Sequence, residues 1–372
     1  MSVSREAFRA CGAVRAAIKS DLRELDPGPG ALVLVACSGG ADSLALAAGL
    51  TGEAREVVRS TRRRGYRINV GAIVVDHGLL PDSDRIADRA AQQCTALGLD
   101  PVVVRRVLVA GPGGPEAAAR AARYAAFDRV AAELNPAAIY LGHTQTDQAE
   151  TVLLGLARGS GINALTGMPT VRGLYRRPLL GLDRATTELA CAGFELSPWR
   201  DPTNSPGSPA LRSQVRHQVL PVLREVLGPG IVPALARSAE LVREDAEVLN
   251  ALAEELYRAA LVATGDTDDD IHAPARSSRP RIKSGVTPEI SQQTAGIVLD
   301  IAVLAAAPAA LRRRVYLRAA ITVGVPHDAI SAKHLGQIDT LVANWHGQQR
   351  IDLPIGVIVW WDCGRLVFSA SD

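Results

Sequence analysis

The chain of 372 residues is long enough for two or three domains of about 150 residues, each with a buried core. Apolar residues make up 47% and charged residues 22% of the sequence, which excludes a wholly disordered chain and a collagen. Lys and Arg number 41 against 39 Asp and Glu, a formal net charge of +2. Binding to a polyanion would therefore depend on a local basic patch.

The five cysteines lie far apart in the sequence, so no C-x-x-C pair is present for zinc, an iron–sulfur cluster or thiol exchange. Scattered thiols are typical of a reducing compartment. The N-terminus is basic and has no long apolar run, unlike a signal peptide. Residues 297–311 are the most apolar later stretch, but Asp300 and Pro308 interrupt them. We therefore expect a cytoplasmic protein that does not bind a membrane, and the sequence leaves a homodimer open.

Apolar runs in the first half of the chain alternate with segments of helical pattern. The predicted strands are 31–37, 69–75, 102–109 and 138–141, and the predicted helices are 43–60, 83–97, 116–134 and 146–157. Strands that are apolar on both faces are typical of a parallel sheet. The alternation predicts an α/β fold with an open, doubly wound, mostly parallel sheet, whose ligands bind at the carboxyl ends of the strands.

The second half has a different pattern. We predict helices at 184–192, from about 211 to 264 and from about 295 to 323, and short strands at 351–353, 357–361 and 366–369. Residues 265–293 are polar and charged, which favours a mobile insertion. The predicted division is an α/β domain at 1–220, a helical domain at 221–325 and a small β-containing domain at 326–372.

The strongest chemical signal is the string SGGADS, from Ser38 to Ser43, which follows the first strand and opens a helix. Adjacent glycines let backbone amides turn toward an anion, and a helix N-terminus presents free N–H groups to it. Asp42 would repel phosphate unless it holds Mg²⁺, which binds one or two carboxylates together with phosphate oxygens. The alternative is an ordinary capped helix start. The string is no Walker A motif, because GxxxxGK[ST] is absent.

SGGADS resembles the first strand–helix turn of the PP-loop ATP pyrophosphatases. Further strings follow in order: VDHGL at 75–79, EAAARAARY at 116–124, GHTQTDQAET at 142–151, RGSG at 158–161, RPLL at 177–180 and WRDPTN at 199–204. Together they closely resemble the bacterial tRNA(Ile)-lysidine synthetases over residues 31 to about 221. The resemblance is looser at 344–348 (NWHGQ) in the C-terminal part.

The resemblance implies a Rossmann-like PP-loop domain and a specific reaction. ATP would activate the C2 carbonyl of the wobble cytidine in the CAU anticodon of tRNA(Ile). The ε-amine of free L-lysine would then attack C2 and release AMP. The implied substrates and cofactors are therefore ATP, Mg²⁺, L-lysine and tRNA(Ile).

The resemblance also implies roles for individual residues. Asp42, His143 and Asp147 would be catalytic, with Asp42 the metal ligand. The residues implied to bind ATP or pyrophosphate are Ser38, Gly39, Gly40, Ala41, Asp42, Ser43, Asp76 and His77. Those implied to bind the adenylate or a tRNA phosphate are Arg120, Arg123, Arg158, Gly159 and Ser160. Asp147 and Glu150 would bind lysine, and Arg212 and Arg216 would bind tRNA.

Each of these motifs also has a purely structural interpretation. Arg120 and Arg123 share a helix face and could simply be solvated. Asp147 and Glu150 lie in the first turns of a predicted helix, where the dipole favours carboxylates. The glycines at 159 and 161 could be C-caps.

Two departures from the family's pattern bear on activity. The family commonly reads HHxDDQ where this chain has His143, Thr144, Gln145, Thr146, Asp147 and Gln148. The family's RNRIR-like string appears at 212–216 as RSQVR, and His217 and Arg224 could compensate for the missing Arg. The alternatives are a catalytically impaired tRNA-binding paralogue and another PP-loop enzyme, such as a tRNA thiolase that would need paired cysteines.

Overall fold

The computed structural model describes residues 4–55, 57, 65–79, 82–110, 114–159, 161–202, 205–262, 296–326, 329–347 and 350–370. Ser160 and the predicted insertion at 265–293 lie outside these residues. The chain forms two compact units. Unit 1 comprises Met1–Arg158 and Ala164–Glu240, and unit 2 comprises Gly159–Asn163 and Leu241–Asp372. The division into three domains stays a prediction.

Unit 1 is built on a six-stranded sheet in the order β3-β2-β1-β4-β6-β5. Its strands are β1 Leu32–Ala36, β2 Asn69–Asp76, β3 Val102–Arg106, β4 Ala138–Leu141, β5 Val171–Arg172 and β6 Tyr175–Arg176. Every pairing is parallel except that of β5 with β6. The predicted mostly parallel α/β sheet is confirmed, and the first four strands lie close to the predicted apolar runs, except that the third ends at Arg106 and not at Val109.

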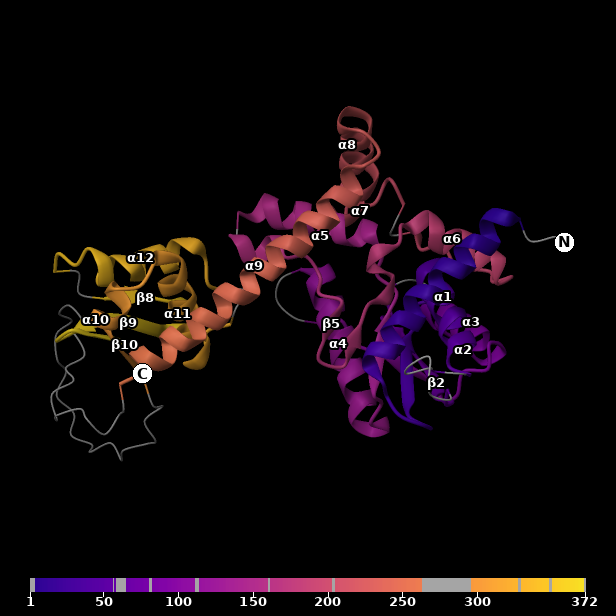
Figure 1. Ribbon diagram of the computed structural model, residues 1–372, viewed down its shortest axis with the longest axis horizontal. Coiled ribbons are helices and arrows are strands. Elements are labelled where there is room, and N and C mark those ends of the chain that lie inside the picture. The colour runs from indigo at the N-terminus through magenta and orange to yellow at the C-terminus, as the bar shows by residue number, and fades with distance from the viewer. Residues whose placement is uncertain are drawn as a thin grey trace. The chain divides into compact units, whose positions relative to one another are not determined.

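Helices cover both faces of this sheet, as the alternation of side chains along β1 shows. Val33 and Val35 pack into a core with α1, α2, α3 and α6, whereas Leu34 packs into a second core with α4. In Figure 1, α1, α2 and α3 lie together beside the sheet. The helices of unit 1 are α1 Arg5–Leu25, α2 Ala41–Glu53, α3 Ser83–Ala96, α4 Pro115–Leu134, α5 Gln145–Arg158, α6 Arg184–Gly193, α7 Leu211–Gln214 and α8 Leu220–Leu227.

Unit 2 contains an antiparallel sheet in the order β7-β10-β9-β8. Its elements are β7 Ile297–Asp300, α10 Ile301–Ala305, α11 Ala309–Thr322, α12 Ala332–Ala343, β8 Ile351–Asp352, β9 Val357–Asp362 and β10 Arg365–Ala370. Helices α11 and α12 pack with this sheet in one apolar core (Figure 1). The long helix α9, Ile231–Ala260, contributes Tyr257 and Ala260 to the same core.

The helix predicted from about residue 295 is wrong at its start. Ile297–Asp300 is a strand, because Val298 and Leu299 pair with Val367 and Leu366 of β10. Asp300 then caps α10 by accepting hydrogen bonds from two backbone amides. An apolar run with no polar face fits either structure, and here pairing with a distant strand decides between them.

Within the described residues, no single helix is long and apolar enough to cross a membrane. One pair of helical segments, Leu211–Leu227 and Ile231–Ala260, meets the length and hydropathy requirement only when taken together, and it is bent by 99°.

Candidate active site

The SGGADS loop (Ser38–Ser43) joins β1 to α2, as predicted. Gly39 has φ +79°, and a Cβ added there would lie 3.1 Å from the Cβ of Ala90 on α3, so both the conformation and the packing need glycine. Gly40 is the N-cap of α2 and brings no side chain to its first amides. The Trp199 amide donates to the Gly39 carbonyl at 2.9 Å, which braces the loop. Among the described residues, no N-cap side chain bonds the first amides of α2, an arrangement that suits an anion.

The two serines of the SGGADS loop differ in their surroundings. The buried Ser43 hydroxyl donates to the Gly40 carbonyl at 2.9 Å and accepts from the Ser38 amide at 3.2 Å, so it shapes the loop. Ser38 is exposed, and its hydroxyl lies 3.3 Å from that of Ser43. Ser38 is thus the serine whose hydroxyl can reach a ligand.

Asp42 lies in the first turn of α2. The Thr187 hydroxyl donates to its Oδ1, and Arg184 Nη1 lies 3.7 Å from its Oδ2. Burial raises the pKa of Asp42, Thr187 and Arg184 act to lower it, and the negative charge of Asp147 adds to the rise. Asp42 could offer its Oδ2 to a cation, because the Thr187 hydroxyl bonds only to Oδ1. Among the described residues no group of three or more His, Cys, Asp or Glu side chains could hold a metal, so phosphate oxygens would have to supply the remaining ligands.

Asp76 and His77 follow at the carboxyl end of β2. Asp76 is buried, accepts from the Gly78 amide at 2.9 Å and lies 3.6 Å from Arg106 Nε. Burial and the nearby Arg123 lower the pKa of His77. Within the described part of the chain, the buried Nδ1 of His77 has no hydrogen-bond partner. The neutral imidazole can therefore accept or donate a hydrogen bond to a ligand.

A carboxylate–arginine network, formed by Asp147, Glu150, Arg212 and Arg216, joins α5 to the segment 212–216. Glu150 has no exposed surface; its oxygens accept from Arg212 Nε at 2.8 Å and from Arg216 at 2.5 and 3.0 Å. Arg216 Nη2 also donates to Asp147 Oδ1 at 3.1 Å. Arg216 lies on a π-helical turn, Val215–Val219, a feature that is frequent at functional sites.

The network brings the two predicted lysine-binding carboxylates together with the two predicted tRNA-binding arginines. Burial alone would lower the pKa of Arg216, but its hydrogen bonds and charge interaction with Glu150 raise it. Likewise burial would raise the pKa of Asp147, but His143 and Arg212 lower it. A lysine ammonium could reach Glu150 only by displacing an arginine, whereas Asp147 is partly exposed, with 15% of its side-chain surface open.

His143 and Thr144 connect β4 to α5. Burial lowers the pKa of His143 to about 3, with Arg123, Arg177 and Arg212 acting in the same direction and Asp147 against them. The backbone amide and hydroxyl of Thr144 both donate to Asp147 Oδ2, at 2.8 and 3.0 Å. Thr144, one of the departures from the family's pattern, therefore orients Asp147.

Sequence reasoning missed Arg177 and Tyr124, which complete an arginine cluster with Arg120 and Arg123. The Cζ atoms of Arg120 and Arg123 lie 5.0 and 5.7 Å from the centre of the Tyr124 ring, and Arg177 Nη2 donates to the Tyr124 hydroxyl at 3.3 Å. Burial and Arg120 lower the pKa of Arg123. The buried Nε atoms of Arg123 and Arg177 have no hydrogen-bond partner among the described residues. Both residues stand in the quoted strings, but only contacts in space reveal the cluster.

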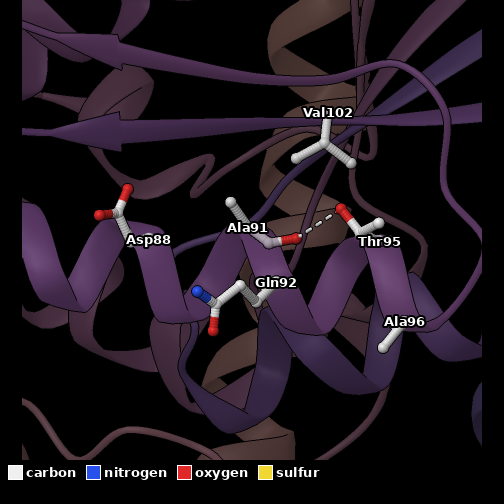
Figure 2. A pocket seen from close by; sticks show the side chains of 6 residues that line it. All are labelled: Asp88, Ala91, Gln92, Thr95, Ala96 and Val102. Carbon is white, nitrogen blue, oxygen red and sulfur yellow. Dashed lines mark hydrogen bonds between the residues drawn. The ribbon is translucent and has the colours of Figure 1, made fainter.

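Arg158 and Gly159 end α5 and are exposed. Gly159 has φ +60°, as in a glycine C-cap. No hydrogen bond or ion pair joins them to the residues above within the described ranges. A shallow groove of about 500 Å³ lies elsewhere, along α3, lined by Asp88, Ala91, Gln92, Thr95, Ala96 and Val102 (Figure 2). None of the predicted site residues lines this groove.

Comparison with known proteins agrees with this geometry. A family model of the PP-loop domain matches residues 15–223, more than half of the chain, and a model of the TilS substrate binding domain matches residues 299–367. Among solved structures, the U34-tRNA thiolase NcsA from Methanococcus maripaludis aligns with a TM-score of 0.51 at 19% identity. That alignment covers 64% of this chain and 80% of the thiolase, and it bears on the fold alone.

Relatives of known name match over almost the whole chain. The tRNA(Ile)-lysidine synthase of Streptomyces coelicolor is 45% identical over 340 residues, which cover 90% of this chain and 84% of that protein. The tRNA(Ile)-lysidine synthase of Leifsonia xyli subsp. xyli is 47% identical over 343 residues, 91% and 90% of the two chains. Identity of this extent, together with the match of the PP-loop model over more than half of the chain, makes this chain a member of the tRNA(Ile)-lysidine synthase family of ATP-using PP-loop enzymes.

Proposed function

We propose that this chain is a ligase that joins free L-lysine to the wobble cytidine of tRNA(Ile) with a CAU anticodon. The C2 carbonyl oxygen of that cytidine attacks the α-phosphate of ATP, and pyrophosphate leaves. The lysine ε-amine then forms a C–N bond at C2, and AMP leaves with the former carbonyl oxygen. The names of the relatives support this reaction, because they match about nine-tenths of the chain.

The SGGADS loop would bind the triphosphate of ATP. The amides of Gly39, Gly40 and Ala41 and the exposed Ser38 hydroxyl are its donors, while Ser43 keeps the loop in shape. Asp42 would hold Mg²⁺, which when bound neutralises charge on the departing pyrophosphate. Asp76 and His77, at the neighbouring strand end, would contact the ribose or adenine.

The arginine cluster would bind the phosphate of the adenylate or of the tRNA backbone. Two of its guanidinium groups keep an unpartnered Nε within the described structure. Tyr124 contacts both groups, that of Arg123 through its ring and that of Arg177 through its hydroxyl. Guanidinium groups bind phosphate oxygens through paired donors. For Arg158, Gly159 and Ser160 the phosphate-binding role rests on the sequence alone.

The carboxylate–arginine network would bind lysine. Asp147 and Arg216 present a carboxylate beside a guanidinium, which complements the α-ammonium and α-carboxylate of a free amino acid. Glu150, buried under both arginines, would act on lysine through them. His143, kept neutral by its lowered pKa, would accept a hydrogen bond from the ε-amine. The remaining donors of Arg212 and Arg216 would face tRNA.

The observation that carries this proposal is the group of guanidinium and imidazole nitrogens that have no partner within the described structure. Two of them belong to His77 and His143, which follow β2 and β4, the strands on either side of β1. The test is incubation of the full chain with ATP, Mg²⁺, labelled lysine and a tRNA(Ile) transcript, followed by nucleoside analysis. Lysidine, AMP and pyrophosphate should form in equal amounts. A transcript with uridine at the wobble position is the matched control and should yield none.

Two other outcomes separate the alternatives. Pyrophosphate release without lysidine would indicate different PP-loop chemistry. Tight tRNA binding with neither product would indicate an impaired paralogue. Since Thr144 donates twice to Asp147, the departure at that position does not favour the paralogue. We place the reaction in the bacterial cytoplasm, where tRNA and ATP are both available.

A further inference from the structure

We infer that Thr187 and Arg184, both on α6, position the carboxylate of Asp42 for magnesium–ATP binding. The inference rests on the role of Asp42 in the proposed function. Neither residue stands in any string that carries the family resemblance, and Thr187 is 145 positions from Asp42 in the sequence.

Thr187 and Arg184 lie next to different oxygens of the Asp42 carboxylate. Thr187 is fully buried, and its hydroxyl donates to Oδ1 of Asp42. Arg184 Nη1 lies 3.7 Å from Oδ2, beyond hydrogen-bond distance. The hydrogen bond thus comes from an uncharged group, the Thr187 hydroxyl, which orients the Asp42 carboxylate without neutralising its charge. Oδ2 remains able to accept a further partner.

Helix α6 is well suited to hold these two groups. Residues at i and i+3 share one helix face, so Arg184 and Thr187 point the same way. The helix is capped by Asp183, whose side chain accepts from the Thr186 amide at 2.7 Å, and it is anchored by the buried Ala190. Glu188 accepts from Arg184 Nε at 3.1 Å and restrains the guanidinium. A rigid element therefore fixes the position of Asp42.

The Thr187 hydroxyl has two acceptors within reach, the Asp42 carboxylate and a carbonyl of its own helix. The same Oγ lies 2.8 Å from the Arg184 carbonyl, a common arrangement for threonine in helices. A hydroxyl has one hydrogen and donates to one acceptor at a time. The charged carboxylate is the stronger acceptor, so Asp42 takes the bond in the free protein. The carbonyl then offers Thr187 a second acceptor when Asp42 turns toward a cation.

The test is binding of α,β-methylene-ATP to the full chain, measured by calorimetry with Mg²⁺ and with EDTA. Thr187→Val removes the hydroxyl and keeps the branched shape. It should weaken binding with Mg²⁺ by about tenfold, the usual effect of losing a hydrogen bond to a charged group, and leave binding in EDTA unchanged. Thr187→Ser should restore the wild-type value. Thr186→Val, on the same helix, is the matched control and should behave as the wild type.

Arg184→Gln provides a second variant, because 35% of the Arg184 side chain is exposed and its loss should not disturb folding. It should weaken binding with Mg²⁺ by a smaller factor. The inference is overturned if Thr187→Val binds the magnesium complex like the wild type, or weakens binding equally with and without Mg²⁺. If instead the wild-type chain binds the analogue equally well with Mg²⁺ and with EDTA, the metal role of Asp42 in the proposed function fails as well.

Discussion

Four buried nitrogen atoms without a hydrogen-bond partner in the described structure lie in one region of unit 1. They are Nδ1 of His77, Nδ1 of His143, Nε of Arg123 and Nε of Arg177. The charge of Arg123 acts on both histidines, and that of Arg177 acts on His143, so the four are close in space. Buried polar groups are nearly always bonded in folded proteins, and an unbonded group costs stability. The phosphate and nucleotide contacts of the proposed function would give these four nitrogens the partners that they lack in the described structure.

The buried charge of Asp42 should lower the stability of the fold and yet support the reaction. Asp42→Asn removes the charge that would hold Mg²⁺ and keeps an acceptor for the Thr187 hydroxyl. Pyrophosphate release on addition of ATP, Mg²⁺ and tRNA should fall by at least about a hundredfold, since a bound metal supplies several kcal/mol. A quantitative pyrophosphate assay measures the loss. Unchanged release would remove Asp42 from the metal site.

The same substitution has a stability signature that depends on pH. Because burial raises the pKa of Asp42 in the folded chain, the folded protein favours the neutral carboxyl. The contribution of the Asp42 carboxyl to stability is therefore fully present below its pKa in the unfolded chain. It is lost as the pH rises through its pKa in the folded chain. Asp42→Asn should thus be at least as stable as the wild type at pH 7, with the difference disappearing in acid. Thermal unfolding at several pH values checks this, and a less stable variant at pH 7 would contradict it.

Asp147 should matter for lysine more than for ATP. Asp147→Asn keeps the acceptor for Thr144 but removes the negative charge next to Arg216. The lysine concentration for half-maximal rate should rise by about tenfold or more, the effect of losing a charge-assisted hydrogen bond, while the ATP requirement stays nearly constant. Steady-state kinetics with each substrate varied in turn separates the two. An equal rise for both substrates would argue against a lysine site.

At the scale of elements, sequence patterns predicted the strands that carry the motifs but not the elements that complete the sheet. β1, β2 and β4 are buried on both faces, and their apolar runs are distinct. β5 and β6 have two residues each and no pattern to detect, and β7 looked helical. The same limit applies to the site. The SGGADS loop is contiguous, whereas Tyr124, Arg177 and Thr187 enter only through contacts between distant segments.

The contact of α1 with β6 gives a prediction at this scale. Arg176 on β6 donates to Asp21 at 2.7 Å and to Glu24 at 2.8 Å, both on α1, and both side chains of the Arg176–Asp21 pair are buried. Arg176→Met leaves Asp21 buried without its partner. The free energy of unfolding should fall by about 3–5 kcal/mol, as for a broken buried ion pair. Denaturant titration followed by circular dichroism measures it.

The matched control is Arg105→Met. Arg105 pairs with Glu133 at 2.5 Å, but 40% and 52% of the two side chains are exposed. Solvent screens such pairs, so this variant should lose about 1 kcal/mol or less. Equal losses in the two variants would mean that the Arg176 contact does not hold α1 to the sheet.

For the whole molecule, a net charge of +2 means that tRNA must be attracted by particular arginines and not by a general positive charge. Composition alone does not show which arginines these are. The structure identifies Arg212 and Arg216 as already bonded to carboxylates, whereas Arg224 on α8 is exposed. Arg224 is therefore the better candidate for a direct phosphate contact in the segment that the sequence associates with tRNA.

Arg224→Gln should accordingly weaken binding of tRNA(Ile) and of an unrelated tRNA by the same factor, because a phosphate contact reads no sequence. The logarithm of the wild-type association constant should fall linearly with the logarithm of salt concentration, and the variant should reduce that slope by about 1. Arg105→Met, whose arginine is paired on β3, should leave the slope unchanged. Filter binding across a salt series measures all three chains. A variant that loses affinity only for tRNA(Ile), or that keeps the wild-type slope, would show that Arg224 does not contact a phosphate.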